Sequence, residues 1–333
     1  MVVAQFNRMP MPEPAGAQAN AESAAAMPTV RERFQLREAG APTLALQVQR
    51  NPSSSGLADV VYVHGGTFGS DMSVFFPLGG RSWADELSAA GLTVWGFDFA
   101  GYGLSDRYPQ AVRGTPGDMT DSLAQLHRAV TAVRLRNGGR AVALLGHSHG
   151  ATVAARYAGD HPGPLSALVL FAPILARPAG AVAAASGTPP SHYPLTIWAQ
   201  YRRFIEDAPR GSAPLIDDAD IEAWSAAFLD GDSSATSRMP RSVRVPSGPL
   251  ADIGALWSGR ALYDPARIVA PTLLVRGQWD SLCSDADAAR LMDALGAQRK
   301  ADVKIERATH LMHLEMQRRV LYEQVQRFLL EVL

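Results

Sequence analysis

A serine between two glycines is the part of this sequence best suited to chemistry. An apolar run at residues 142–145 leads into Gly146-His147-Ser148-His149-Gly150, and an alanine-rich helical pattern follows. This order predicts a buried strand, a sharp turn and a helix, because small residues two positions either side of Ser148 let the two backbones approach. Such a turn would expose the hydroxyl as a nucleophile. The alternative is a glycine-rich turn whose serine has no catalytic role.

A serine hydroxyl needs a base to activate it and an acid to orient that base. Two later apolar strands are followed by such residues: Asp280 comes after residues 272–276, and His310 comes after residues 302–306. In a parallel sheet, catalytic groups lie at the carboxyl ends of the strands. We therefore expect Ser148 as nucleophile, His310 as base and Asp280 as the residue that orients it.

Other residues compete for two of these roles. His313 lies three residues after His310 and is an alternative base. Asp285 and Asp287 are alternatives to Asp280, although both fit the first turn of a helix, where acids are stabilising. The position directly after a strand favours His310 and Asp280.

The two histidines beside the serine also suggest a metal site. His147 and His149 form a His-x-His pair, but the acids and third histidine of a dinuclear metallohydrolase are not arranged around them. Cys283 is the only cysteine, which excludes an intrachain disulfide. We expect no metal and no cofactor.

Strand and helix patterns alternate along most of the chain. Strands that are apolar throughout and alternate with helices predict a parallel sheet covered on both faces. An antiparallel hairpin joined by Gly40-Ala41-Pro42 precedes them. The eight predicted strands are residues 29–37, 43–50, 59–63, 92–97, 142–145, 165–171, 272–276 and 302–306, and the predicted helices are residues 82–90, 120–136, the segment from the serine turn to 158, 284–295 and 315–330.

Composition divides the chain into a tail, a core and an insertion. Residues 1–28 are rich in Ala, Pro and Met and predict a flexible N-terminal arm. Residues 29–173 and 264–333 carry the alternating strands and helices. Residues 174–263 contain helical patches and many large aromatic residues, and predict a helical cap inserted into the core.

Five motifs together resemble the α/β-hydrolase superfamily, in particular its capped, esterase-like members. They are His64-Gly65-Gly66, Asp98-Phe99-Ala100-Gly101-Tyr102-Gly103-Leu104-Ser105, Gly146-His147-Ser148-His149-Gly150, Gly277-Gln278-Trp279-Asp280 and Thr309-His310. The resemblance implies a mostly parallel, eight-stranded twisted sheet with helices on both faces. It also implies an oxyanion hole formed by backbone N–H groups of His149 and of Gly66 or Thr67.

Composition and resemblance together suggest a hydrolase of a small molecule. The net charge of −1 gives no reason to expect a nucleic-acid or membrane partner, and no apolar run is long enough to span a bilayer. We expect a cytoplasmic monomer or homodimer. The expected substrate is a carboxylic ester or lactone that is mainly apolar and moderately large, and macrocyclic lactones are among the candidates.

The aromatic residues of the cap and of two core loops suggest how such a substrate would be held. Aromatic side chains often line apolar binding pockets, although here they could instead form the cap's own core. The expected substrate-binding residues are Phe68, Trp198, Tyr201, Trp224 and Trp279. Alternative activities are a C–C bond hydrolase, an amidase, a haloperoxidase-like enzyme or an acyltransferase. A different possibility is a non-catalytic homologue that only binds a ligand.

Overall fold

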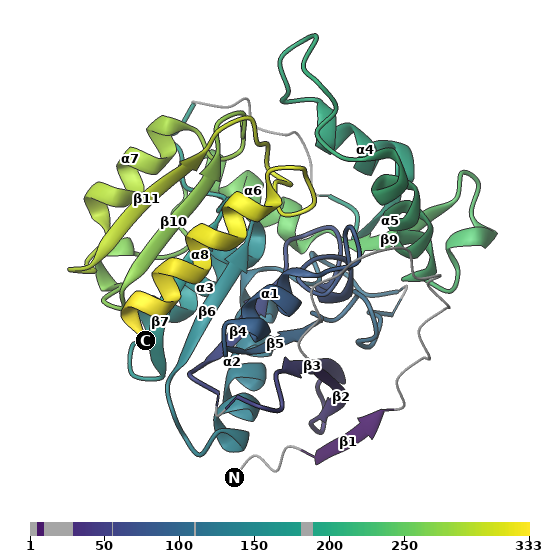
Figure 1. Cartoon of the computed structure of the whole chain (residues 1–333). Coiled ribbons are helices and arrows are strands. Elements are labelled where there is room, and N and C mark those ends of the chain that lie inside the picture. The colour runs from purple at the N-terminus through teal and green to yellow at the C-terminus, as the bar shows by residue number, and fades with distance from the viewer. Residues whose placement is uncertain (1–4, 10–28, 55, 110, 181–188) are drawn as a thin grey trace.

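A twisted sheet of nine strands forms the centre of the computed structural model, which describes residues 5–9, 29–54, 56–109, 111–180 and 189–333 (Figure 1). The strand order is β1-β2-β3-β5-β4-β6-β7-β10-β11. Neighbours from β1 to β5 pair antiparallel, and those from β5 to β11 pair parallel. The strands are β1 (Gln5–Met9), β2 (Val30–Arg37), β3 (Leu44–Arg50), β4 (Asp59–Val63), β5 (Thr93–Phe97), β6 (Val142–His147), β7 (Leu165–Phe171), β10 (Thr272–Gly277) and β11 (Lys300–Ile305).

Helices cover both faces of this sheet, which explains why its central strands are apolar throughout. In β4, Val60 and Tyr62 pack toward one face, whereas Val61 and Val63 pack toward the other. The first face is covered by α1 (Trp83–Ala89) and α8 (Arg318–Val332), and the second by α2 (Met119–Arg136), α3 (His149–Asp160) and α7 (Asp285–Ala294). The predicted α/β fold with a mostly parallel sheet is confirmed.

The first strand corrects the prediction for the N-terminal arm. Residues Gln5–Met9 pair antiparallel with β2 and add a ninth strand to the eight that were predicted. The sequence signal was weak because this segment is short and lacks a clean alternation of apolar and polar residues. The rest of the predicted arm lies outside the described residues.

The described part of the segment between β7 and β10 adds no strand to the nine-stranded sheet. It contains α4 (Ile197–Ile205), α5 (Asp218–Asp230) and α6 (Gly248–Trp257), and we refer to residues 174–263 as the cap. The cap also holds an antiparallel pair, β8 (His192–Thr196) and β9 (Ser242–Pro246), that was not predicted. Pro194 and Pro246 hid these strands, because proline argues against a strand in a sequence pattern.

Cap and core are joined by buried aromatic contacts. Trp224 of α5 donates from its indole Nε1 to the Met72 carbonyl at 2.9 Å, and its ring packs edge-on against Phe68. Three short 3-10 helices lie in the loops between the other elements, at Ser70–Met72, Ala235–Ser237 and Pro265–Arg267. The cap is thus seated on the core by a defined contact beside the loop that follows β4.

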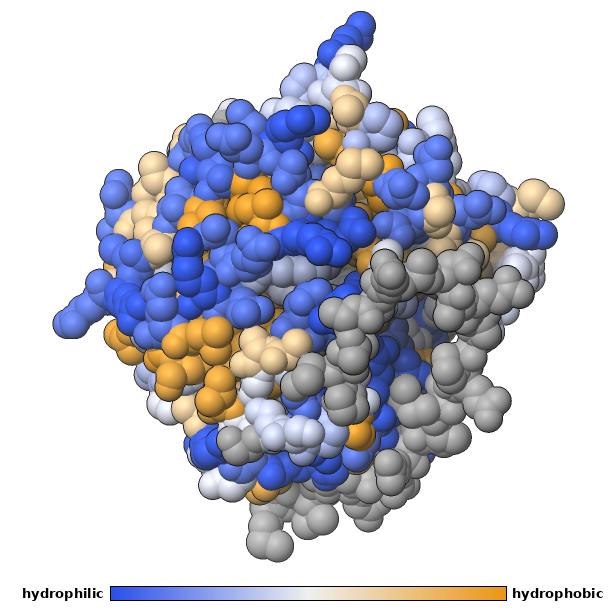
Figure 2. Space-filling view, viewed as in Figure 1, coloured by the Kyte–Doolittle hydropathy of each residue, from blue (hydrophilic) through white to orange (hydrophobic). Residues whose placement is uncertain are grey.

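The face seen in Figure 2 is mostly hydrophilic, and its hydrophobic residues gather in a few small patches. Among the helices of the described segments, none combines the length and apolar character needed to cross a bilayer.

Candidate active site

Ser148 occupies the turn between β6 and α3 in a backbone conformation that few serines adopt. Its φ of 55° and ψ of −124° lie outside the regions favoured by L-residues, at a cost on the order of 1–3 kcal/mol. The flanking glycines permit this turn. A Cβ on Gly146 would lie 2.6 Å from the Cα of Ala151, and a Cβ on Gly150 would lie 2.2 Å from the His64 carbonyl oxygen. Backbone packing therefore explains the glycine spacing seen in the sequence.

Three side chains from separate strand ends form a continuous hydrogen-bonded chain. Ser148 Oγ lies 2.8 Å from His310 Nε2, and His310 Nδ1 lies 3.1 and 3.0 Å from the two Asp280 carboxylate oxygens. The backbone N–H groups of Leu282 and Cys283 donate to the same carboxylate and fix its position. Asp280 holds the His310 proton on Nδ1, which leaves Nε2 free to accept the serine proton.

A second buried acid holds the loop that carries His310. Thr309 donates its backbone N–H to the Glu315 carboxylate at 3.1 Å, and its hydroxyl donates to the same group. Burial raises the pKa of Glu315 to about 7, although the hydrogen bonds from Thr309 act in the opposite direction. Glu315 therefore titrates near neutral pH inside the loop that positions the histidine.

The three residues predicted for the oxyanion hole gather around Ser148. Gly66, Thr67 and His149 line the same cavity as the serine hydroxyl. His149 is the first residue of α3, so its backbone N–H has no carbonyl partner within the helix and lies at the positive end of the helix dipole. The Gly66 carbonyl accepts a hydrogen bond of 2.8 Å from the Tyr102 hydroxyl, which holds the loop in place.

A family comparison agrees with this geometry. The sequence matches the model of the Alpha/beta hydrolase family over residues 60–323, which is most of the chain. The chain belongs to the α/β-hydrolase family. Family and site geometry together support hydrolase activity.

Solved structures share the fold of this α/β-hydrolase at low sequence identity. The thioesterase domain from the curacin biosynthetic pathway is 18% identical, with a TM-score of 0.61, over 90% of this chain and 99% of that one. Rv0554 from Mycobacterium tuberculosis gives the same four values. A monoacylglycerol lipase from Paleococcus ferrophilus is 19% identical, with a TM-score of 0.51, over 82% of this chain and 96% of that one. No curated protein matches the sequence.

His313, the alternative base, lies away from the serine hydroxyl. Its ring is fully buried against Phe68 and Phe171, and neither ring nitrogen has a hydrogen-bond partner among the described residues. Burial lowers the pKa of His313 to about 3. The ring therefore stays neutral and packs as part of the core.

The alternative acids belong to the first turn of α7. Asp287 accepts from the backbone N–H and hydroxyl of Ser284 and pairs with Arg177. Asp285 is exposed and pairs with Arg276 and Lys304. Neither carboxylate contacts His310.

The two histidines of the His-x-His pair bind different partners. His147 Nε2 donates to the His310 carbonyl at 3.2 Å. His149 Nε2 donates to the Asp252 carboxylate of α6 at 2.7 Å, and both of these side chains are buried. Within the described part of the chain, no three His, Cys, Asp or Glu residues are grouped to hold a metal ion. The His149–Asp252 bond instead ties the nucleophile turn to the cap.

The cavity at Ser148 has a volume of about 310 Å³ and lies between core and cap. The core supplies the serine, His310 and the oxyanion residues. The cap supplies an apolar wall with several polar side chains in it. The cap residues that line the cavity are Tyr193, Leu195, Ala199, Gln200, Arg203, Pro249, Leu250, Ile253 and Trp257.

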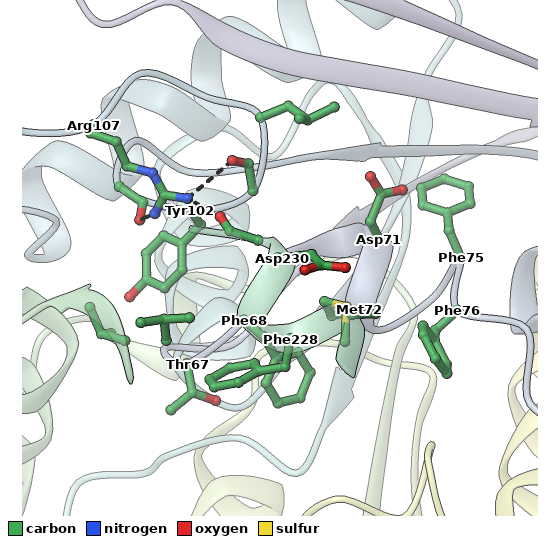
Figure 3. Close-up of a pocket in the computed structure, with 18 of the residues that line it drawn as sticks. Thr67, Phe68, Asp71, Met72, Phe75, Phe76, Tyr102, Arg107, Phe228 and Asp230 are labelled. Carbon is green, nitrogen blue, oxygen red and sulfur yellow. Dashed lines mark hydrogen bonds between the residues drawn. The ribbon is translucent and has the colours of Figure 1, made fainter. Parts of the chain in front are cut away.

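A second cavity, of about 480 Å³, adjoins the first at Thr67 (Figure 3). Phe68 and Phe228 form an apolar side of it, and Arg107 lies on another side, where it donates to backbone carbonyls. Tyr102 also lines it and reaches the oxyanion loop through the hydrogen bond to Gly66.

The aromatic residues predicted to bind substrate do not line the cavity at Ser148. Trp198 is 66% exposed and stacks on Tyr201, on a different side of α4 from the cavity. Trp224 is buried in the contact between cap and core, and Phe68 lines the second cavity. Trp279 is half-buried, and its backbone N–H donates to the Ala308 carbonyl. Substrate binding by these five residues stays a prediction, because aromatic content does not reveal the rotation of a helix or which rings form the cap's own core.

The residues missed by sequence reasoning are polar. Gln200 and Arg203 are three positions apart, as expected for residues on one side of a helix. Charged and amide residues are common on surface helices, so this spacing did not mark them as binding residues. Asp252 carried a clearer signal, since it is the only charged residue in the otherwise apolar segment Gly248–Trp257. A lone acid in an apolar helix requires a buried partner, and here that partner is His149.

Proposed function

We propose that this α/β-hydrolase cleaves a carboxylic ester through an acyl-enzyme on Ser148. The hydrogen-bonded chain from Ser148 Oγ through His310 to Asp280 carries this proposal, because its two contacts of 2.8 and 3.0 Å have the lengths that proton transfer requires. The cavity beside Ser148 gives an ester access to the hydroxyl.

The reaction follows from the positions of these groups. His310 Nε2 takes the hydroxyl proton as Ser148 Oγ attacks the ester carbon, and the backbone N–H groups of His149 and Thr67 stabilise the resulting oxyanion. His310 then returns that proton to the leaving alkoxide, so that an alcohol departs and an acyl-serine remains. A water molecule, deprotonated by His310, releases the acid and restores the serine.

The cavity also bears on substrate size. A volume of about 310 Å³ lies at the lower end of the ~300–1,000 Å³ range of small-molecule sites. This favours an ester with an acyl chain of moderate length over a large macrocyclic lactone. Small lactones remain within the proposal, because their ring opening uses the same acyl-enzyme.

A fluorophosphonate probe tests the nucleophile directly. Wild type should be labelled covalently and Ser148→Ala should not, and p-nitrophenyl esters of increasing acyl length should be hydrolysed up to the limit of the cavity. Folded wild-type protein that resists the probe and hydrolyses no ester or lactone would instead be a ligand-binding homologue.

A further inference from the structure

The cap side of the catalytic cavity contains polar atoms that have no partner. Gln200 is 1% exposed, yet neither its Nε2 nor its Oε1 makes a hydrogen bond with any described residue. The same holds for Arg203 Nη2 and for the indole Nε1 of Trp257, which are buried as well. All three residues line the cavity that contains Ser148. Buried polar groups are normally paired, so several unpaired ones on residues that line one cavity point to a ligand that pairs with them.

The second cavity shows that this is not a general property of the cleft between cap and core. There, Arg33 pairs with Asp71, Tyr102 donates to the Gly66 carbonyl, and Arg107 donates to backbone carbonyls (Figure 3). Each of these polar side chains is used by the protein itself. Of these two cavities, only the one at the nucleophile is lined by residues with buried polar atoms that lack a partner among the described residues, and this is where a substrate must bind.

The types of the free atoms define the complementary group. A glutamine amide offers one acceptor and two donors, and arginine and tryptophan offer donors only. A ligand carboxamide would pair with Gln200 through two antiparallel N–H···O bonds. Its carbonyl oxygen has a further lone pair, which can accept from Arg203 or Trp257. A ketone or ester oxygen would leave Gln200 Oε1 without a donor.

The charges around Arg203 favour a neutral ligand over a carboxylate. Arg203 already forms an ion pair with Glu206, and Asp207 and Asp280 act on it electrostatically. Arg202 is a second cation nearby and also pairs with Glu206, so two cations face three anions and offer no net positive charge for a fourth anion. A carboxylate also accepts hydrogen bonds only, and so would not donate to Gln200.

We propose that the substrate carries a carboxamide in addition to its scissile ester, and that Gln200 and Arg203 bind it. This inference rests on the proposed ester hydrolysis at Ser148 and narrows its substrate class to amide-bearing esters. The apolar cap residues Leu195, Leu250 and Ile253 contact the hydrocarbon part.

Matched substrates test the proposal. Two series are made, p-nitrophenyl esters varied in the acyl chain and acetate esters varied in the alcohol, each with a primary carboxamide at increasing distance from the scissile bond, because only a primary amide has an N–H on the same side as its carbonyl oxygen. Each is compared with its ketone, alkane and carboxylate analogues. At one chain length or more, wild type should hydrolyse the amide with kcat/KM at least about fivefold above every analogue, since each neutral hydrogen bond contributes about 0.5–1.5 kcal/mol.

Variants assign that preference to its residue. Gln200→Leu should bring the ratio of amide to alkane kcat/KM close to one, and Gln200→Met serves if the leucine variant does not fold. Leu250→Ala is the matched control, because it alters the apolar wall and should keep the ratio. Three results would overturn the proposal. They are a wild-type ratio of amide to alkane kcat/KM near one at all chain lengths, a carboxylate substrate preferred over the amide, and an amide preference that remains in Gln200→Leu.

Calorimetry separates this inference from the proposed function. Ser148→Ala should bind the amide esters more tightly than the alkane esters by the same factor. If no ester is hydrolysed but this binding preference is found, the amide site stands and the hydrolase proposal fails. If esters are hydrolysed without any amide preference, the hydrolase stands and the amide site fails.

Discussion

The core and the cap form opposite sides of one cavity and use their polar groups in different ways. On the core side, Ser148, His310 and Asp280 bond to one another, and Thr309 and Glu315 hold the histidine loop. On the cap side, Gln200 and Arg203 have buried polar atoms without a partner among the residues that the structure describes. A catalytic site must be preorganised before substrate arrives, whereas a selective site keeps polar groups free for the substrate. Under the two proposals made above, the core would carry the chemistry and the cap the choice of substrate.

The largest expected effect comes from removing the base on the core side. His310→Ala should lower kcat by about 10⁴-fold or more, because the serine then has no proton acceptor. His313→Ala should retain most of the turnover, since His313 packs in the core and contacts no reacting atom. Steady-state kinetics with a p-nitrophenyl ester measures both. If His313→Ala lost turnover and His310→Ala kept it, His313 would be the base and the assignment of this role to His310 would be wrong.

Replacing a glycine by alanine should have opposite effects on folding stability in the core and in the cap. Gly150→Ala should destabilise the protein by more than about 4 kcal/mol or prevent folding, because its Cβ would lie 2.2 Å from the His64 carbonyl oxygen and 2.4 Å from that of Val63. Gly254→Ala in cap helix α6, where a Cβ meets nothing within 4 Å, should stabilise by about 0.5–1 kcal/mol. Urea denaturation gives both values. A tolerated Gly150→Ala would show that the nucleophile turn is less constrained than its geometry implies.

The same contrast explains what could be predicted from sequence. Gly146, Ser148 and Gly150 were identifiable because a strained strand–helix turn leaves a local requirement for small residues. Asp280 and His310 followed from their positions at strand ends. The cap residues were missed because the buried side of α4 is set by packing against α5, with Phe204 directed at Trp224. That packing places Gln200 in the cavity and Trp198 in solvent, and nothing local in the sequence distinguishes this rotation from the opposite one.

The pH dependence of stability should show the electrostatic cost of the buried acid in the core. Burial raises the pKa of Glu315 to about 7 in the folded protein, against about 4.3 in the unfolded chain. Between these values the unfolded state has lost the proton and the folded state keeps it, so stability falls as pH rises through this window. The loss should approach about 3 kcal/mol by pH 8 relative to Glu315→Gln, which does not titrate. Urea denaturation of both proteins at pH 5 and pH 8 measures it, and equal pH dependence would contradict it.

The smallest predicted effect concerns the bond that crosses from cap to core. Asp252→Ala leaves the buried His149 Nε2–H without its acceptor and should cost about 1–3 kcal/mol of stability. Asp252→Asn keeps an oxygen acceptor and should recover most of it. Because we propose that His149 also supplies an oxyanion N–H, Asp252→Ala should lower kcat several-fold while KM changes less, whereas Gln200→Leu should change the ratio between substrates. If Asp252→Ala altered substrate preference and left kcat intact, Asp252 would act in substrate selection, like Gln200, and not in holding the nucleophile turn.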